Sequence, residues 1–344
     1  MIIVPLTGSY FFAMKVFITR VIPDAGLQLL QNAGITVTQW TEKRDLTPTE
    51  LIDACKQHDA LLSSGANNID ANFLNECKHL KVIALLSVGY DNVDVKAATQ
   101  LNIPIGNTPG VLSGATADTA FLLMLAASRK AFYVHKKILK GEWKFFDPTT
   151  DLGIELNGKT LGIFGLGKIG FELAKKCMGA YNMKVIYHNR GNNEEAEEKL
   201  NAIKVSFDEL LQQSDVLSVH TALTPETKGI FNTTAFSKMK PSAIFINTAR
   251  GSIHNEEDLK KALEAGTIWG AGLDVTNPEP MAKDNPLLDM PNVAILPHIG
   301  SATVDTRNAM SVIAAKNTIA GLAGLRLPHI VNPEIYQDWS KISC

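Results

Sequence analysis

The chain has 344 residues, which exceeds the usual size of one domain and makes two domains the expected organisation. Hydrophobic residues make up 45% and charged residues 20% of the chain, as in an ordinary globular protein. The formal net charge of −2 excludes a strongly basic surface, so we expect neither nucleic acid nor an anionic membrane as a partner.

Cysteine use and hydropathy indicate the compartment. Neither a CxxC pair nor metal-ligand spacing occurs among the cysteines, which are Cys55, Cys77, Cys177 and Cys344. We therefore expect no metal, and reduced thiols fit a cytoplasmic protein. No stretch is long and apolar enough to span a bilayer. Residues 1–13 are apolar but lack a basic n-region, so we interpret them as an extension ahead of the first domain.

The first part of the chain alternates strand-like and helix-like runs, which implies a parallel sheet with helices on both faces. The helix-like stretches include Pro23–Ala33 and Pro48–Gln57. Thr47 is a suitable cap for the second one, because Pro48 fits the first helical position and Glu50 completes a capping box. The strand-like runs are Lys15–Thr19, Ile35–Trp40, Ala60–Ser64, Lys81–Leu86 and Ile103–Asn107.

A glycine-rich turn follows the apolar run Thr160–Phe164 and opens a helix-like stretch over Ile169–Met178, before a second strand-like run at Lys184–Asn189. This is GxGxxG in the strand, turn and helix context of a dinucleotide site. Its glycines permit the tight turn, the approach of a pyrophosphate and close helix–strand packing, and the helix N-terminus favours phosphate. We therefore expect the cofactor to bind the residues of this loop, which are Gly165, Gly167, Lys168, Ile169 and Gly170.

The end of the second strand bears on the choice of dinucleotide. Sites that prefer NAD usually carry Asp or Glu there, whereas this chain has Asn189 and Arg190. Asn189 is neutral and would not repel a 2′-phosphate, and Arg190 could pair with one. The alternative is that Arg190 is a solvated loop residue. We favour NADP(H) on this local chemistry, with NAD(H) possible.

Three apolar runs in the second half each end near a polar residue of catalytic type. The runs are residues 243–250, 269–279 and 293–298. Parallel strands place their carboxyl ends together, so Arg250, Asp274 or Glu279, and His298 should meet over one crevice. An arginine, a carboxylate and a histidine there suit an anionic carbonyl substrate. Singly, Arg250 could cap a turn, Glu279 could be a surface acid and His298 could be structural.

The fold class expected is α/β, with two doubly wound parallel-sheet domains. The stretch 301–324 reads as a helix, so we place residues 14–109 and 301–344 in one discontinuous, flavodoxin-like substrate-binding domain. A Rossmann NAD(P)-binding domain at residues 110–300 would be inserted into it. Because one domain would be made of two chain segments, the chain would pass twice between the domains. Two such connections suit a hinge.

The chain resembles the D-isomer-specific 2-hydroxyacid dehydrogenases, most closely the glyoxylate/hydroxypyruvate reductases, from about Lys15 to Pro333. The stretches that carry the resemblance are SVGYDNVD (87–94), NTPGVLSGATADTAFLLML (107–125), GLGKIG (165–170), LTPETKG (223–229), FINTARG (245–251), AGLDVTNPEP (271–280) and LPHIGSAT (296–303).

The resemblance implies a role for each matching residue. Arg250 would bind the carboxylate and carbonyl of the substrate, and His298 would be the acid–base group with Glu279 as its partner. Asp274 would hold the nicotinamide end, although it could instead bond to backbone at its strand end. The remaining implied positions are Val88 and Gly89 for the substrate carboxylate, Thr116, His220 and Thr248 for the cofactor, and Trp143 for the active site of the neighbouring subunit in a homodimer.

The implied activity is reduction of glyoxylate to glycolate and of hydroxypyruvate to D-glycerate. A 2-ketogluconate- or D-lactate-type reductase stays open, because selectivity for the substrate side chain sits in loops. A non-catalytic, dinucleotide-sensing regulator of this fold is the second class of function. The chain carries no long tail or basic patch that would favour the regulator.

Overall fold

The computed structural model of the protein describes residues 14–65 and 67–336. The extension expected over residues 1–13 therefore lies outside the described residues. Contacts between Cα atoms divide the chain into two compact units, one formed by residues 1–111 and 303–344 and the other by residues 112–302. We name these unit 1 and unit 2.

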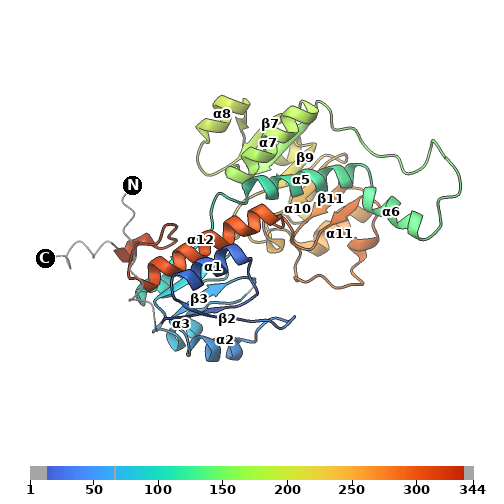
Figure 1. Ribbon diagram of the computed structural model, residues 1–344. Coiled ribbons are helices and arrows are strands. Elements are labelled where there is room, and N and C mark those ends of the chain that lie inside the picture. Colours follow the sequence, from blue (N-terminus) through green and yellow to red (C-terminus); the bar gives the residue numbers. More distant parts are fainter. Residues whose placement is uncertain (1–13, 66, 337–344) are drawn as a thin grey trace. The chain divides into compact units, whose positions relative to one another are not determined.

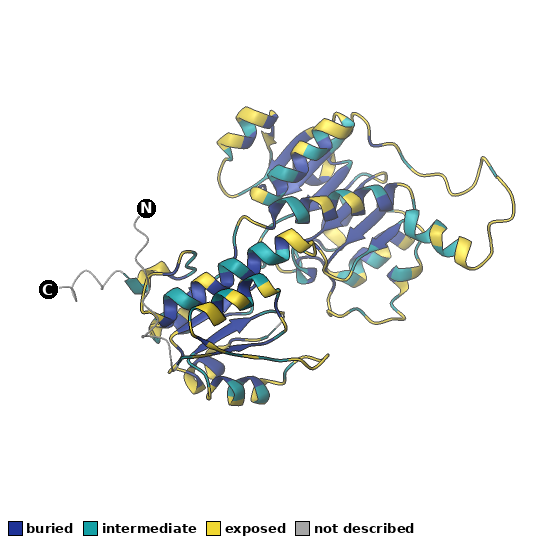
Figure 2. Cartoon of the chain, in the orientation of Figure 1, coloured by how far each residue is buried: buried dark blue, intermediate teal, exposed yellow. Residues whose placement is uncertain are grey.

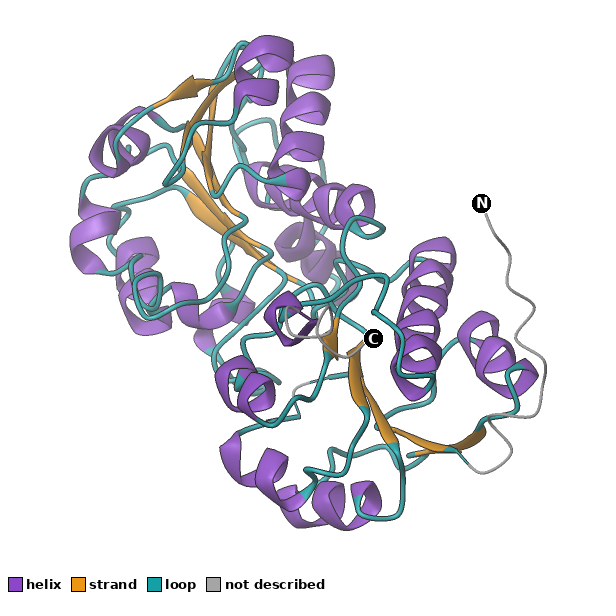
Figure 3. Ribbon diagram, turned by 90° about the vertical axis from the view of Figure 1, so that its left-hand side faces the viewer, coloured by secondary structure: helices purple, strands orange, loops and turns teal. Residues whose placement is uncertain are grey.

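Unit 1 is built on a five-stranded sheet with the strand order β2-β1-β3-β4-β5, in which every neighbouring pair is parallel. Helices α1 and α12 contact each other, and Figure 3 shows helices on both faces of this sheet. The elements are β1 (Lys15–Ile18), α1 (Asp24–Asn32), β2 (Thr36–Gln39), α2 (Pro48–Cys55), β3 (Ala60–Ser63), α3 (Ala71–Glu76), β4 (Val82–Leu85), α4 (Val95–Gln100), β5 (Ile105–Gly106), α12 (Val304–Leu322) and η3 (Pro333–Tyr336).

We compare a predicted helix cap and a predicted strand of unit 1 with the structure. The capping box of Thr47 and Glu50 at the start of α2 is confirmed. The strand expected over Ile103–Asn107 is wrong in its length, because β5 comprises only Ile105 and Gly106. Pro104 lacks the N–H that a longer strand would need at that position.

Unit 2 is built on a seven-stranded parallel sheet with the order β12-β11-β10-β9-β6-β7-β8. Its elements are α5 (Ser113–Ser128), α6 (Ala131–Leu139), β6 (Thr160–Phe164), α7 (Lys168–Tyr181), β7 (Lys184–His188), α8 (Glu194–Leu200), β8 (Ile203–Lys204), α9 (Phe207–Gln213), β9 (Val216–Val219), α10 (Thr233–Ser237), β10 (Ile244–Asn247), η1 (Gly251–Ile253), α11 (Glu256–Glu264), β11 (Gly270–Leu273), η2 (Pro286–Asp289) and β12 (Val293–Ile295), as labelled in part in Figure 1.

The sheet of unit 2 is buried on both faces, as its uninterrupted apolar strands require. Along β10, Ile244 and Ile246 belong to one hydrophobic cluster and Phe245 to the cluster on the opposite face. Figure 2 shows the strands buried and the outward surfaces of the helices exposed. The fold class predicted from the sequence, two α/β units with parallel sheets, is confirmed. None of the described helices is long and apolar enough to cross a membrane.

Candidate active site

The strand order of unit 2 reverses between β6 and β9, which are neighbours in the sheet although β7 and β8 intervene in the chain. A ligand of an open parallel sheet binds beyond the carboxyl ends of its strands at such a switch point. The glycine-rich loop follows β6 directly, and His220 follows β9. The topology therefore points to a dinucleotide at this edge.

The glycines of the loop have three different surroundings. A Cβ on Gly165, where φ is +92°, would lie 2.7 Å from the backbone nitrogen of Thr221. A Cβ on Gly170 would lie 2.9 Å from Ile163, so helix α7 packs closely on β6. A Cβ on Gly167 would meet nothing within 4 Å, so the backbone there borders open space. Together with the exposed Lys168 and the N-terminus of α7, this space fits a pyrophosphate.

The side chain of Asn189, just past β7, binds the backbone of the glycine-rich loop. Its Oδ1 accepts a hydrogen bond from the N–H of Leu166 at 2.7 Å, and its Nδ2 donates to the carbonyl of Leu166 at 3.0 Å. The Nδ2 of Asn193 donates to the same carbonyl at 2.9 Å. An aspartate at position 189 could not make the second of these bonds, because an ionised carboxylate only accepts. Asn189 thus fixes the loop.

Arg190 lies just past β7, and Lys204 at the end of β8 bonds to the loop that carries it. Lys204 is the last residue of β8, and its Nζ donates to Oδ1 of Asn192 at 2.9 Å and to the carbonyl of Arg190 at 3.5 Å. Arg190 itself is exposed. The ammonium of Lys204 thus lies beside the loop that follows β7, and cations there suit an additional phosphate on a dinucleotide.

His220 lies between two hydroxyl groups at the end of β9. Its Nε2 is 2.8 Å from Oγ of Ser218, and its Nδ1 is 3.4 Å from Oγ1 of Thr248. Burial lowers the pKa of His220 to about 4, so the ring is neutral at physiological pH. A neutral ring with polar neighbours suits the wall of a cofactor site, and it does not suit acid catalysis at neutral pH.

Arg250 lies on a short loop between β10 and η1. Its Nη1 donates to the carbonyl of Ala249 at 2.7 Å. The positive charge of Arg250 also helps to lower the pKa of Glu279. Arg250 and Glu279 thus interact electrostatically, and their roles in a reaction stay a prediction.

His298 and Glu279 are joined by a short hydrogen bond. Nδ1 of His298 donates to Oε1 of Glu279 at 2.5 Å, and the side chains are 47% and 41% exposed. Burial alone would raise the pKa of Glu279, but the bond from His298 and the nearby positive charges lower it below its usual value. Because Nδ1 is bound to the carboxylate, Nε2 is the nitrogen of His298 that can exchange a proton with a substrate.

Asp274 is buried and binds backbone. Its two oxygens accept hydrogen bonds from the N–H groups of Ile299 and Gly300, both at 2.8 Å. Burial raises its pKa, and these two bonds offset part of that rise. The backbone N–H of His298 also donates to the carbonyl of Asp274, and Thr116 Oγ1 donates to the carbonyl of Gly300. The structural role that the sequence left open for Asp274 is therefore observed.

In unit 1 the loop after β4 has its own set of bonds. Asn107 donates to the carbonyl of Val88 at 2.9 Å, and Ser87 Oγ donates to the carbonyl of Gly89 at 2.7 Å. No described residue of unit 1 accepts a hydrogen bond from the backbone N–H of Val88 or Gly89. Both N–H groups can therefore donate to an anion.

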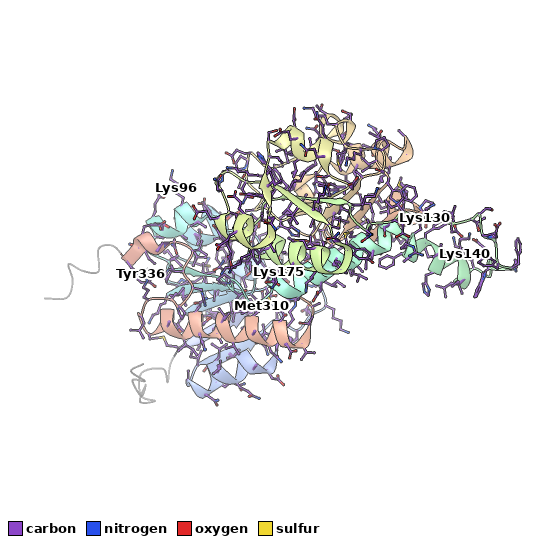
Figure 4. The ribbon with its side chains drawn as sticks, turned by 90° about the horizontal axis from the view of Figure 1, so that it is seen from above. Lys96, Lys130, Lys140, Lys175, Met310 and Tyr336 are labelled. Carbon is purple, nitrogen blue, oxygen red and sulfur yellow. The ribbon has the colours of Figure 1, made fainter. Side chains whose placement is uncertain are left out.

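Helix α6 and the chain after it carry exposed apolar side chains. Trp143 is 73% exposed and Phe146 is 85% exposed. This segment extends away from the sheet of unit 2 in Figure 1, and Figure 4 labels Lys130 and Lys140, which flank α6. A large exposed apolar surface is typical of an interaction site.

The described part of the chain, residues 14–65 and 67–336, contains no group of three or more His, Cys, Asp or Glu side chains that could hold a metal ion.

Comparison with known proteins assigns the family. Residues 121–300 match the family described as D-isomer specific 2-hydroxyacid dehydrogenase, NAD binding domain. A glyoxylate reductase from Thermococcus litoralis is 41% identical over 325 residues, which are 93% of this chain and 97% of that protein. The chain belongs to the D-isomer specific 2-hydroxyacid dehydrogenases. It is therefore an NAD(P)-dependent enzyme that interconverts 2-oxo and 2-hydroxy acids.

Solved structures agree with this assignment. A protein from Thermus thermophilus aligns with a TM-score of 0.86 at 40% identity, over 92% of this chain and 100% of that one. An NADPH-dependent glyoxylate/hydroxypyruvate reductase from Sinorhizobium meliloti aligns with a TM-score of 0.77 at 29% identity, over 92% of this chain and 97% of that one. The family resemblance read from the sequence is confirmed.

Sequence reasoning missed four residues around this site. They are Asn193, Lys204, Asn247 and His254, and their contacts depend on the path of loops. The asparagine at the end of β10 had one available signal, since Asn directly after an apolar strand often bonds to the following turn. No sequence signal distinguishes His254 from a packing histidine.

We predict that the stability of unit 2 rises as the pH increases from 4 to 6.5. Burial lowers the pKa of His254 from 6.5 to about 4, so the unfolded chain binds a proton in this window that the folded chain does not. His254 alone should contribute on the order of 3 kcal/mol, fully present above pH 6.5. Urea unfolding followed by circular dichroism between pH 4.5 and 7.5 measures this. His254→Asn should reduce the slope, and an unchanged slope would contradict the prediction.

Proposed function

We propose that this enzyme reduces glyoxylate to glycolate and hydroxypyruvate to D-glycerate, with NADPH as the preferred cofactor. The observation that carries the proposal is the 2.5 Å pair of His298 and Glu279 beside Arg250, on the sheet edge that also carries the glycine-rich loop. The relatives named as glyoxylate reductases support the choice of substrate.

Arg250 supplies positive charge where the reaction needs it. Addition of hydride to the carbonyl carbon of a 2-oxo acid leaves negative charge on the carbonyl oxygen. A planar guanidinium can bind the substrate carboxylate and stabilise that developing charge at the same time. In unit 1 we assign the backbone N–H groups of Val88 and Gly89 to the substrate carboxylate. The bound nicotinamide supplies the hydride.

His298 supplies the proton that completes the reduction. Its Nε2–H donates to the carbonyl oxygen as that oxygen becomes an alkoxide, which gives the 2-hydroxy acid and a neutral imidazole. Glu279 accepts from Nδ1–H throughout, so it fixes the ring orientation and stabilises the imidazolium that precedes transfer. In the direction of oxidation, the neutral imidazole takes the proton back.

Turnover assays test this function directly. We expect loss of reduced-nicotinamide absorbance with glyoxylate and with hydroxypyruvate, and faster turnover with NADPH than with NADH at equal concentration. Arg250→Gln should lower kcat/KM by about a hundredfold or more. Turnover confined to pyruvate or 2-ketogluconate would move the assignment to another reductase of the family. Cofactor binding without turnover of any 2-oxo acid would favour a sensing role.

Glu279→Gln should change the pH dependence of reduction. The carboxylate keeps its charge across the working range because its pKa is lowered, and it favours the protonated ring of His298. Without that charge, the pH above which kcat/KM for reduction falls should move down. Glu257→Gln, an exposed carboxylate on α11 that pairs with Lys260, serves as the matched control. An unshifted profile in Glu279→Gln would count against the pairing.

The proposed preference for NADPH is argued from the cations at the ends of β7 and β8. We propose that Arg190 and Lys204 bind the 2′-phosphate, and that Asn189 and Asn193 hold the glycine-rich loop beside it. Gly165, Gly167, Lys168, Ile169 and Gly170 would then line the pyrophosphate, and Thr116, His220, Thr248 and Asp274 would line or support the rest of the cofactor site.

Substitution of Lys204 tests the assigned preference. Lys204→Ala should raise the KM for NADPH by about tenfold, because one charge-assisted bond to phosphate is lost, and should leave the KM for NADH within about twofold. Lys199→Ala removes a cation of α8 that pairs with Glu195 and should change neither value. Equal effects of Lys204→Ala on both cofactors would show that Lys204 does not read the 2′-phosphate.

We also propose that the exposed apolar segment of α6 and the chain after it binds a second copy of this chain, with Trp143 serving the active site of that copy. Its exposed apolar side chains support this assembly. A monomer in sedimentation velocity would contradict it.

We place the enzyme in the cytoplasm, where its thiols stay reduced.

A further inference from the structure

The side-chain amide of Asn247, at the end of β10, bonds to the backbone of the loop that carries Arg250. Its Oδ1 accepts from the N–H of Ala249 at 2.9 Å, and its Nδ2 donates to the carbonyl of Arg250 at 2.9 Å. The same Nδ2 lies 3.0 Å from Nδ1 of His254, which follows η1. The first two bonds join Asn247 to the loop itself and the third reaches His254 beyond it, so the amide connects the loop to the chain on its far side.

The two backbone bonds fix the orientation of the amide. The N–H of Ala249 requires an acceptor opposite it, and the carbonyl of Arg250 requires a donor. The NH2 group of Asn247 must therefore also face His254, and Nδ1 of that ring must accept. This requirement assigns the neutral ring with its proton on Nε2, because a proton on Nδ1 would oppose the N–H of Asn247.

Burial makes the bond between Asn247 and His254 necessary, because both side chains are shielded from water. Asn247 is 0% exposed and His254 is 2% exposed, so water cannot replace the bond between them. The ring of His254 packs edge-on against Phe245 at a centroid distance of 5.7 Å. No described residue accepts from its Nε2. Burial lowers the pKa of His254 to about 4, which keeps Nδ1 unprotonated at physiological pH.

The same loop contacts the segment that leads to Glu279. A Cβ on Gly251 would lie 2.0 Å from the carbonyl oxygen of Thr276, so the two backbones touch at that point. Glu256, the first residue of α11, accepts from the N–H of Asn277 at 3.3 Å. A displacement of the loop after β10 would therefore disturb Arg250 and the carboxylate partner of His298 together.

We propose that His254 is a positioning residue for Arg250, because its unprotonated Nδ1 accepts from the amide of Asn247 and thereby holds the arginine loop in place. The inference rests on the proposed role of Arg250 in binding substrate. His254 does not contact substrate in this scheme, and its action passes entirely through Asn247.

Two substitutions at His254 distinguish a role as hydrogen-bond acceptor from a role in packing alone. His254→Leu fills the space without an acceptor, whereas His254→Asn offers Oδ1 at the place of Nδ1. We expect His254→Leu to lower kcat/KM for the 2-oxo acid by about tenfold, since a buried donor of Asn247 loses its partner. The Kd for NADPH, from fluorescence titration, should stay within about twofold. His254→Asn should restore most of the lost kcat/KM.

The outcomes distinguish this inference from the proposed function. Wild-type kcat/KM in His254→Leu, or equal losses in the leucine and asparagine variants, would overturn the positioning role. Arg250→Gln is measured in parallel: if it keeps full activity, the role of Arg250 fails first. Where His254→Leu does not fold, NMR of the wild-type protein with nitrogen-labelled histidines decides. A proton on Nε2 of His254 supports the inference, and one on Nδ1 overturns it.

Discussion

The constraint on which the structure of unit 2 depends is that every strand of its seven-stranded sheet runs in the same direction. Parallel strands need crossover connections, and these place helices on both faces. The strands must then be apolar on both sides, and polar side chains are left only at the strand ends. All the carboxyl ends meet at one edge, so Arg250, Asp274 and His298 gather there although their strands are separated in the chain.

The site is positioned by side chains that bind backbone at these strand ends. Asn189 holds the glycine-rich loop, Asn247 holds the arginine loop, and Asp274 holds the backbone at Ile299 and Gly300. Each of them follows or ends a buried strand. Loops that satisfy their own backbone groups through one rigid anchor lose less freedom on ligand binding, which favours a preorganised site.

Much of this arrangement could be predicted from sequence, because it depends on local patterns. The strand Thr160–Phe164 and the helix after the glycine-rich loop follow from apolar runs and glycine spacing, and the pair of His298 and Glu279 follows from family motifs at strand ends. The two hydrogen bonds between Asn189 and Leu166 could not be predicted. They join residues 23 apart in the chain, which the pairing of β6 with β7 brings together. The contact of His254 with Asn247 depends on a loop path that no periodicity encodes.

The anchoring also explains how an exposed histidine can be held in one orientation. His298 has a φ of +54°, in the left-handed region that costs a residue with a Cβ on the order of 1 kcal/mol. Its N–H donates to the carbonyl of Asp274, and the two N–H groups after it donate to the carboxylate of Asp274. These three bonds to the buried Asp274 offset the backbone strain at His298. The ring needs no packing to fix it, so its nitrogen opposite Glu279 stays open to a substrate.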